Sequence, residues 1–211
     1  MKIGIIGSGN VGGALGSRWA KAGHEVVFGS RHPHGGDMKE LLKQAGGKSR
    51  AATLAETARE ADVLLLATPW TATQEIVEHL GELNGKIIID ATNPMFPDLS
   101  GLTHGTTTSG GEQVAQWARG AKLVKAFNTV GSNIMTDPSF GGGHRPAMFY
   151  CGDDQHAKDV AKKLIDEIGF EAIDAGAFRQ ARLLEPMAML WVSLAFAQGM
   201  GREFAFTLLR R

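Results

Sequence analysis

Hydrophobic positions along the 211-residue chain fall in short runs that alternate with segments of helical periodicity. The first apolar run, residues 3–6, is too short for a helix and is typical of a fully buried strand. Similar runs predict strands at residues 24–29, 49–53, 62–67, 86–90, 123–127, 147–151 and 170–174. Helical spacing lies between them, at residues 11–22, 38–45, 54–60, 71–80, 111–119 and 155–168. This alternation predicts an α/β protein with a doubly wound, mostly parallel sheet.

The pattern changes at Arg179, after which the chain is helical in character and has almost no polar face. A helix that is apolar all round is buried in a larger structure or in an interface. We therefore divide the chain into a main domain, residues 1–178, and a small C-terminal helical extension, residues 179–211. We expect the extension to contribute to a homodimer or higher oligomer.

A glycine motif stands between the first predicted strand and the first predicted helix: Gly7-Ser8-Gly9-Asn10-Val11-Gly12. Gly7 permits a tight turn, Gly9 lets the backbone approach a pyrophosphate, and Gly12 lets the helix pack closely on the sheet. The N-terminus of the helix offers unpaired N–H groups and a positive dipole end to phosphates. Because a second strand follows at the expected distance, the motif predicts a dinucleotide-binding Rossmann domain.

The end of the second predicted strand distinguishes between the two nicotinamide cofactors. NAD-binding proteins usually place Asp or Glu there to bond the ribose 2′-hydroxyl, whereas this chain has Ser30 and Arg31. A hydroxyl followed by a guanidinium suits a 2′-phosphate, since arginine offers planar, permanently charged donors. The sequence therefore favours NADP(H) over NAD(H).

Polar residues follow several other strands, and in a doubly wound sheet the carboxyl ends of strands line the ligand crevice. Thr68 and Pro69 are placed where the ribose and pyrophosphate pass, and Trp70 either lines that crevice or packs under its own helix. Asn93 is expected to offer its amide near the nicotinamide, and Asn128 follows the next strand. We expect the long loop 95–110 to form part of an acceptor site, and loop 131–146 to be flexible.

Composition and charge exclude several partners and settings. The formal net charge is zero, which gives no reason to expect nucleic acid. The apolar runs are too short to span a membrane, and the early first strand leaves no room for a signal peptide, so we expect a cytoplasmic protein. The single cysteine, Cys151, is expected to be a buried, inert thiol. His32 and His34 have no further ligands nearby, so no metal site is predicted.

Groups that shuttle protons are scarce. Oxidation of an alcohol usually needs His, Lys or Tyr as a proton carrier, and none occurs after Arg179. Tyr150 lies within a predicted strand, and we expect His24, His79 and His156 to face solvent, which leaves His104 and His144 in the long loops. Direct hydride transfer between two rings needs mainly positioning, because the cofactor carries the chemistry. We therefore assign no catalytic side chain.

The chain resembles the NADPH-dependent reductases of the deazaflavin coenzyme F420, also called F420H2:NADP oxidoreductases. The resemblance runs over nearly the whole chain and rests on residues 5–31 and on the segments ATPWTAT, KAFNTV, YCGDDQHAK, DAGAFRQARLLEP and AQGMG. It implies a Rossmann domain and direct hydride transfer without an acid–base residue. It also implies roles by position: Ser8, Gly9, Asn10 and Val11 at the pyrophosphate, Ser30 and Arg31 at the 2′-phosphate, and Thr68 and Pro69 beside the ribose and nicotinamide.

Three functions stay open on the sequence. The first is an NADPH-dependent oxidoreductase whose small-molecule partner is a deazaflavin or flavin. The second keeps NADPH and uses another small acceptor, such as an imine or a ferric chelate. The third is a sensor that binds NADP without turnover. The enzymes require a cavity beside the nicotinamide, which we expect to be lined by Asn93, Asn128, Thr129 and the C-terminal helices.

Overall fold

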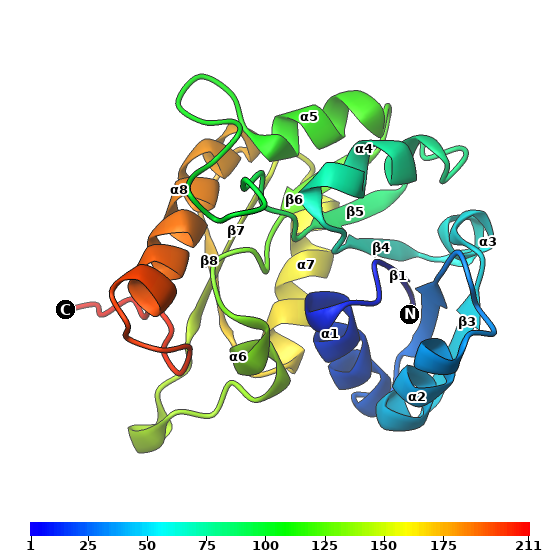
Figure 1. Ribbon diagram of the computed structural model, residues 1–211, viewed down its shortest axis with the longest axis horizontal. Coiled ribbons are helices and arrows are strands. Elements are labelled where there is room, and N and C mark those ends of the chain that lie inside the picture. Colours follow the sequence, from blue (N-terminus) through cyan, green and yellow to red (C-terminus); the bar gives the residue numbers. More distant parts are fainter.

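Eight strands form one sheet in the computed structural model, which describes all 211 residues (Figure 1). They are β1 (Lys2–Ile6), β2 (Glu25–Gly29), β3 (Lys48–Ala52), β4 (Val63–Leu66), β5 (Ile87–Asp90), β6 (Lys122–Lys125), β7 (Ala147–Gly152) and β8 (Glu171–Asp174). Their order across the sheet is β3-β2-β1-β4-β5-β6-β7-β8. Only β6 and β7 pair antiparallel. The predicted doubly wound, mostly parallel sheet is confirmed.

The central strands are apolar along their whole length because helices cover both faces of the sheet. Every residue of β4 and β5 is buried, including the terminal Asp90. Strand β4 pairs with β1 on one side and β5 on the other, so the chain reverses its direction of travel across the sheet between β3 and β4. Ligands of open α/β sheets bind at the carboxyl ends of the strands beside such a switch point.

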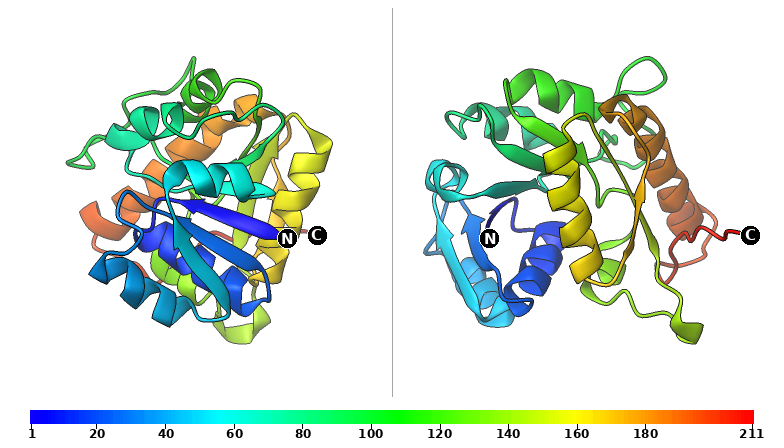
Figure 2. Two further views of the ribbon diagram at one scale, coloured as in Figure 1. Left: turned by 90° about the vertical axis from the view of Figure 1, so that its right-hand side faces the viewer. Right: turned by 180° about the vertical axis from the view of Figure 1, so that it is seen from behind.

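Eight α-helices accompany the strands: α1 (Asn10–Lys21), α2 (Gly36–Ala45), α3 (Leu54–Glu60), α4 (Trp70–Glu78), α5 (Gly110–Trp117), α6 (Ser132–Thr136), α7 (Gln155–Glu167) and α8 (Ala181–Val192). The larger core lies between the sheet and α1, α2, α6 and α7, and the smaller one between the sheet and α3, α4 and α5. Helix α8 packs beside α5 and onto β7, and Figure 2 shows α7 on the opposite face. None of these helices combines the length and the hydrophobicity needed to cross a bilayer.

Helix α1 lies close against the sheet because two of its buried positions are glycines. A Cβ on Gly16 would come within 2.6 Å of the Phe28 ring, so only glycine allows this approach. Trp19 on the same face is fully buried and donates its indole N–H to the carbonyl of Leu164 in α7, at 3.1 Å. This packing fixes the position of the N-terminus of α1 above the end of β1.

The expectation that residues 131–146 form one flexible loop is wrong for its first part, where α6 forms. Ile134 and Met135 are buried against the larger core, and Arg18 of α1 donates to the carbonyl of Thr136 at 3.0 Å. Five residues are too few to show helical periodicity in a sequence. Tertiary packing therefore decides this helix.

The expectation that the chain stays helical to its end is also wrong. Helix α8 continues as a π-helical turn to Ala197, and no helix follows. Gly199 and Gly201 have positive φ angles of 68° and 75°, a conformation that ends a helix. The tail then turns back: Phe204 stacks on Trp191 with ring centroids 5.3 Å apart.

The expectation that His24 faces solvent is also wrong. Its side chain is only 8% exposed and lies 2.8 Å from the carboxylate of Glu167, with the Met1 amino group 3.3 Å from the other ring nitrogen. Glu167 is far away in the sequence, so nothing near His24 indicated this partner. The imidazole ties the start of the chain to the end of α7, away from the strand ends that form the site.

Candidate functional site

The N-terminus of α1 presents backbone N–H groups that the protein leaves without partners. Its capping residue is Gly9, which has no side chain to accept them, and no acidic residue stands in the first turn. The hydrogen bonds within the helix begin at Gly13, whose N–H donates to the carbonyl of Gly9 at 2.7 Å, so the N–H groups before it are left over. Such an end binds anions through its N–H groups and its positive dipole.

The three motif glycines have different surroundings, which agree with the roles predicted for them. Gly7 has a φ of +104°, and a Cβ there would lie 2.4 Å from the carbonyl oxygen of Ala67. A Cβ on Gly12 would lie 1.8 Å from the carbonyl oxygen of Gly7. By contrast, a Cβ on Gly9 would meet no protein atom within 4 Å. The space above Gly9 is therefore open.

A cavity of about 600 Å³ lies over this entrance and extends to the ends of β2 and β4. It brings together nine of the residues proposed from the sequence: Gly7, Ser8, Gly9, Asn10, Val11, Ser30, Arg31, Thr68 and Pro69. Its remaining lining comes from Gly29, His32, Leu54, Ala67 and Ile76. Residues from three separate loops thus meet in one hollow at the carboxyl edge of the sheet.

Ser30 and Arg31 form the end of this cavity that lies beyond β2. The hydroxyl oxygen of Ser30 accepts the backbone N–H of His32 at 3.0 Å, which shapes the turn and leaves the hydroxyl hydrogen free to donate. Arg31 is exposed and makes no ion pair or hydrogen bond with another residue. Its guanidinium is therefore available to an anionic ligand.

At the end of β4, Thr68 and Pro69 are held by a local hydrogen-bond chain. The hydroxyls of Thr68 and Thr73 lie 2.8 Å apart, and Thr73 donates to the carbonyl of Pro69 at 3.0 Å. Because Thr73 uses its single hydrogen on Pro69, Thr68 must be the donor in the first bond. Trp70, for which the sequence left two interpretations, packs against Trp117 and His104, with ring centroids 5.5 and 5.4 Å away, and does not line this cavity.

Asn93 and Asn128 lie at the ends of β5 and β6 and bond to each other instead of lining the cavity. Asn93 donates to the backbone carbonyl of Asn128 at 2.9 Å, and Asn128 donates to the side-chain oxygen of Asn93 at 3.1 Å. The second hydrogen of the Asn128 amide goes to the carbonyl of Leu184 in α8, at 3.0 Å. The Asn128 side-chain oxygen is buried and has no donor. This amide pair joins the strand ends to α8.

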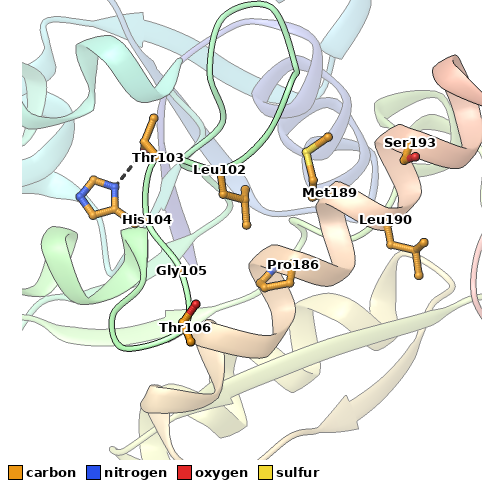
Figure 3. Close-up of a pocket in the computed structure, with 9 residues that line it drawn as sticks. All are labelled: Leu102, Thr103, His104, Gly105, Thr106, Pro186, Met189, Leu190 and Ser193. Carbon is orange, nitrogen blue, oxygen red and sulfur yellow. Dashed lines mark hydrogen bonds between the residues drawn. The ribbon is translucent and has the colours of Figure 1, made fainter.

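A second cavity, of about 630 Å³, lies between the 95–110 loop and α8 (Figure 3). It is lined by Leu102, Thr103, His104, Gly105, Thr106, Pro186, Met189, Leu190 and Ser193. Asn93, Asn128 and Thr129 do not line it, contrary to the expectation from the sequence; Thr129 is only 1% exposed. The lining combines apolar groups and hydroxyls and includes no Asp, Glu, Lys or Arg.

His104 is the one titratable residue of that lining, and its contacts fix its tautomer. The Thr103 hydroxyl donates to the carbonyl of Pro94 at 3.0 Å, so its oxygen accepts from His104 Nδ1 at 2.9 Å. In Figure 3 the imidazole points away from α8. His104 therefore turns its ring toward Trp70 and away from the space between the 95–110 loop and α8.

Beneath the amide pair lies a charged cluster that is closed to solvent. Lys125 Nζ is 2.9 Å from carboxylate oxygens of both Asp90 and Glu185 and donates to the carbonyl of Thr92 at 2.7 Å. All three ionisable side chains are at most 1% exposed. Burial alone lowers the pKa of Lys125, but attraction to Asp90 and then to Glu185 outweighs it, so the net shift is upward. The lysine stays charged.

Sequence reasoning missed this cluster. Asp90 ends the predicted strand 86–90, but Lys125 lies in the middle of the predicted strand 123–127, so the two were not placed together; the structure ends β5 and β6 at these residues. Glu185 comes from a distant helix and could not be paired with them from spacing. Cys151, by contrast, is fully buried as predicted, and burial raises its thiol pKa to about 12. No three His, Cys, Asp or Glu side chains are grouped as they would be around a metal ion.

Comparison with known proteins places these features in a family. A family model described as NADP oxidoreductase, coenzyme F420-dependent, matches residues 2–94. The F420-dependent NADP reductase of Methanothermobacter marburgensis is 31% identical, over 92% of this chain and 92% of its own length. The rat Metalloreductase STEAP3 is 27% identical over 89% of this chain, which spans only 36% of that protein.

Solved structures give the same picture. A protein from Arthrobacter sp. FB24, provisionally described as an F420-dependent NADP reductase, superposes with a TM-score of 0.88 at 30% identity, and the match covers both chains completely. The reductive aminase from Aspergillus terreus superposes with a TM-score of 0.68 at 18% identity, covering 95% of this chain and 62% of its own. At that identity the likeness shows a shared fold alone.

Proposed function

Because this chain belongs to the family of coenzyme F420-dependent NADP oxidoreductases and is an NADP-dependent oxidoreductase, we propose that it transfers a hydride directly between NADPH and a deazaflavin or flavin-type acceptor. The observation that carries the proposal is the cavity over α1, where the open helix entrance and an unpaired Arg31 share one hollow. Phosphate groups at two positions of one ligand fit this arrangement.

The chain's own residues account for binding of NADP(H). The free N–H groups of Asn10 and Val11 would hold the pyrophosphate above Gly9, with no Cβ in the way. Ser30 and Arg31 would hold the 2′-phosphate through a hydroxyl donor and a planar guanidinium. No carboxylate ends β2, the position from which one would repel a 2′-phosphate.

From this end, the carboxyl edge of the sheet leads toward α8. Thr68 and Pro69, at the end of β4, would contact the ribose, and the amide pair Asn93 and Asn128, at the ends of β5 and β6, would border the nicotinamide. This assignment follows the strand order, in which β4, β5 and β6 are neighbours. The cavity between the 95–110 loop and α8 lies next along the same edge.

We assign the acceptor to that second cavity. An uncharged lining of Leu102, Met189 and hydroxyl groups suits a planar, largely apolar ring. It offers no cation to a ferric chelate, and its apolar groups give contact area to the ring of a deazaflavin or flavin. The division of the chain would follow this use: residues 1–178 bind the dinucleotide and residues 179–211 complete the acceptor site.

Bound NADPH supplies the hydride, and the protein's contribution is placement. The 95–110 loop and α8, which form the two walls of the second cavity, would hold the two rings in register, and this task needs no acid or base. His104 turns away from the space between the 95–110 loop and α8, so the proton that completes reduction of the acceptor ring would come from solvent and not from this side chain. No side chain is therefore assigned a catalytic role.

The outer face of α8 supports the further proposal of a homo-oligomer. Leu183 and Leu190 lie two turns apart on the helix and are 65% and 51% exposed. Phe196 continues the apolar surface at 56% exposure. Analytical ultracentrifugation tests the proposal: a Leu183→Glu variant, which changes no residue of either cavity, should sediment as a monomer where the wild type sediments as an oligomer.

The decisive assay measures NADPH oxidation against coenzyme F420, FMN, FAD, an imine and ferric citrate in parallel. The proposal predicts turnover with the deazaflavin or a flavin. Turnover with the imine or ferric citrate alone would assign a different acceptor. Tight NADP binding without turnover of any acceptor would make the protein a sensor and refute the enzymatic proposal.

A further inference from the structure

We propose that Glu185 is a positioning residue for the reaction: it clamps together the two walls of the cavity between the 95–110 loop and α8. The inference rests on the proposed function, because it takes that cavity as the acceptor site. It goes further in assigning a role to a buried carboxylate that touches neither cavity.

The first wall is held through backbone N–H groups. The two carboxylate oxygens of Glu185 accept the N–H of Gly110 at 2.8 Å and of Gly111 at 2.9 Å. These are the first two residues of α5. The cavity-lining residues 102–106 precede them closely in the chain, separated only by residues 107–109. Glu185 therefore satisfies the N-terminus of α5 in place of water, and its negative charge faces the positive end of the helix dipole.

The second wall begins at the next residue of α8. Pro186 lines the cavity, and Met189, Leu190 and Ser193 follow over the next two turns. One side chain therefore bonds to the segment that carries one wall and belongs to the helix that carries the other. Figure 3 shows the loop and the helix facing each other across this space.

Lys125 anchors the clamp to the sheet. Its Nζ binds Glu185 and Asp90 at 2.9 Å each, and Asp90 in turn accepts the N–H and hydroxyl of Thr92 at 2.9 and 2.7 Å. Lys125 and Asp90 are the last residues of β6 and β5, three positions before the amide pair Asn128 and Asn93. The walls are thereby set relative to the strand ends assigned to the nicotinamide.

The energetics favour a rigid connection. Buried charged hydrogen bonds that are fully satisfied hold one geometry, and removing one member leaves the others uncompensated. Each carboxylate oxygen of Glu185 accepts a backbone N–H, and the three ammonium hydrogens of Lys125 have three partners: Asp90, the carbonyl of Thr92 and Glu185. A change at Glu185 should therefore alter the distance between the 95–110 loop and α8 and leave the cavity over α1 as it is.

The test is the Glu185→Gln variant, which keeps the shape of the side chain and removes its charge. We expect the KM for the acceptor to rise by about tenfold or more, because small misplacements of reacting groups are costly. The Kd for NADPH should stay at the wild-type value. Amide hydrogen exchange should become faster in residues 102–111 and in α8, and should stay unchanged in residues 2–29.

The matched control is Glu112→Gln, which weakens another tie between α5 and α8. Glu112 pairs with Arg182 at 2.6 Å at the edge of the same two helices, where both side chains are partly exposed. It should leave the acceptor KM and the exchange of residues 102–106 unchanged, although it also removes the carboxylate that accepts from the Ser109 hydroxyl. A purely structural role for Glu185 predicts instead a fall in kcat in proportion to the folded fraction, with an unchanged KM.

Three results would overturn the inference: an acceptor KM and exchange pattern equal to wild type, a loss of NADPH affinity as large as the rise in KM, or the purely structural pattern. If Glu185→Gln does not fold, the triple variant Asp90→Asn/Lys125→Met/Glu185→Met removes all three buried charges together and should give the same changes in KM and exchange. If the wild type turns over no acceptor, the proposed function fails, and the exchange measurement still decides whether Glu185 joins the walls.

Discussion

Gly12 packs so closely on Gly7 that a Cβ on the first would lie 1.8 Å from the carbonyl oxygen of the second. This contact joins the start of α1 to the turn that leaves β1. The open position beside it, Gly9, has no protein atom within 4 Å of where its Cβ would stand. The fold therefore requires glycine at position 12, whereas only a bound ligand would require glycine at position 9.

Alanine at the two positions should give opposite results. Gly12→Ala forces the turn to shift, and we expect the free energy of unfolding to fall by about 1–3 kcal/mol in urea titrations. Gly9→Ala should leave it within about 0.5 kcal/mol of wild type, because the position is open and its φ is −72°. NADPH binding by Gly9→Ala should nonetheless weaken at least about tenfold, or 1.4 kcal/mol. Undiminished NADPH affinity in Gly9→Ala would exclude a pyrophosphate above Gly9.

Lys125→Met should destabilise the protein strongly, because it leaves the carboxylates of Asp90 and Glu185 buried without their cation. Breaking a buried ion pair in this way costs about 3–5 kcal/mol, measured as a loss in the free energy of unfolding. Lys122→Met on the same strand is the control: Lys122 pairs with Asp154 at 3.0 Å at a partly exposed site, and its loss should cost about 1 kcal/mol or less. Equal losses for the two variants would contradict the role given to the cluster.

Cys151 should resist thiol reagents in the folded protein. Burial raises its pKa to about 12, so only about one thiol in ten thousand is ionised at pH 8, and the sulfur is closed to solvent. Unfolding in urea returns the pKa to near 8.5 and should release one reactive thiol per chain. Reaction of the native protein at the rate of a free cysteine would show that β7 opens.

Stability should depend on pH through Glu112 in a defined direction. The hydrogen bond from Arg182 lowers the pKa of Glu112 below its ordinary value of 4.5. A lowered folded-state pKa means that the contribution is complete above about pH 4.5 and is lost as the pH falls through the folded-state value. The difference in Tm between wild type and Glu112→Gln should therefore shrink from pH 7 to pH 3. A difference that grows at low pH would reverse this assignment.

Much of the fold followed from local patterns. Continuous apolar runs identified β4 and β5, because strands covered on both faces need no polar positions. The glycine motif placed the turn after β1, since its spacing reflects backbone contacts within a short stretch of chain. Nine of the proposed site residues meet in one cavity for the same reason: the carboxyl ends of parallel strands share an edge.

The remaining features depend on contacts between distant residues. Glu185 reaches Gly110 and Lys125 across 75 and 60 positions, and no local pattern marks a carboxylate for burial. Helix α6 exists because Ile134 and Met135 pack on the core. The helical pattern before Gly199 does not continue into the tail, because Phe204 packs back onto Trp191, a contact that no local pattern marks.

The central claim is that a dinucleotide with a 2′-phosphate binds over α1 and is gripped by Arg31. Isothermal titration of wild type and Arg31→Ala with NADPH and NADH tests it most directly, with Arg59→Ala, an exposed arginine outside the cavity, as the control for lost charge. We predict that Arg31→Ala weakens NADPH binding by about 1.5–3 kcal/mol and leaves NADH binding unchanged. The Arg59→Ala variant should bind both cofactors with wild-type affinity. Equal weakening of both cofactors, or a wild type that binds neither, would contradict the account.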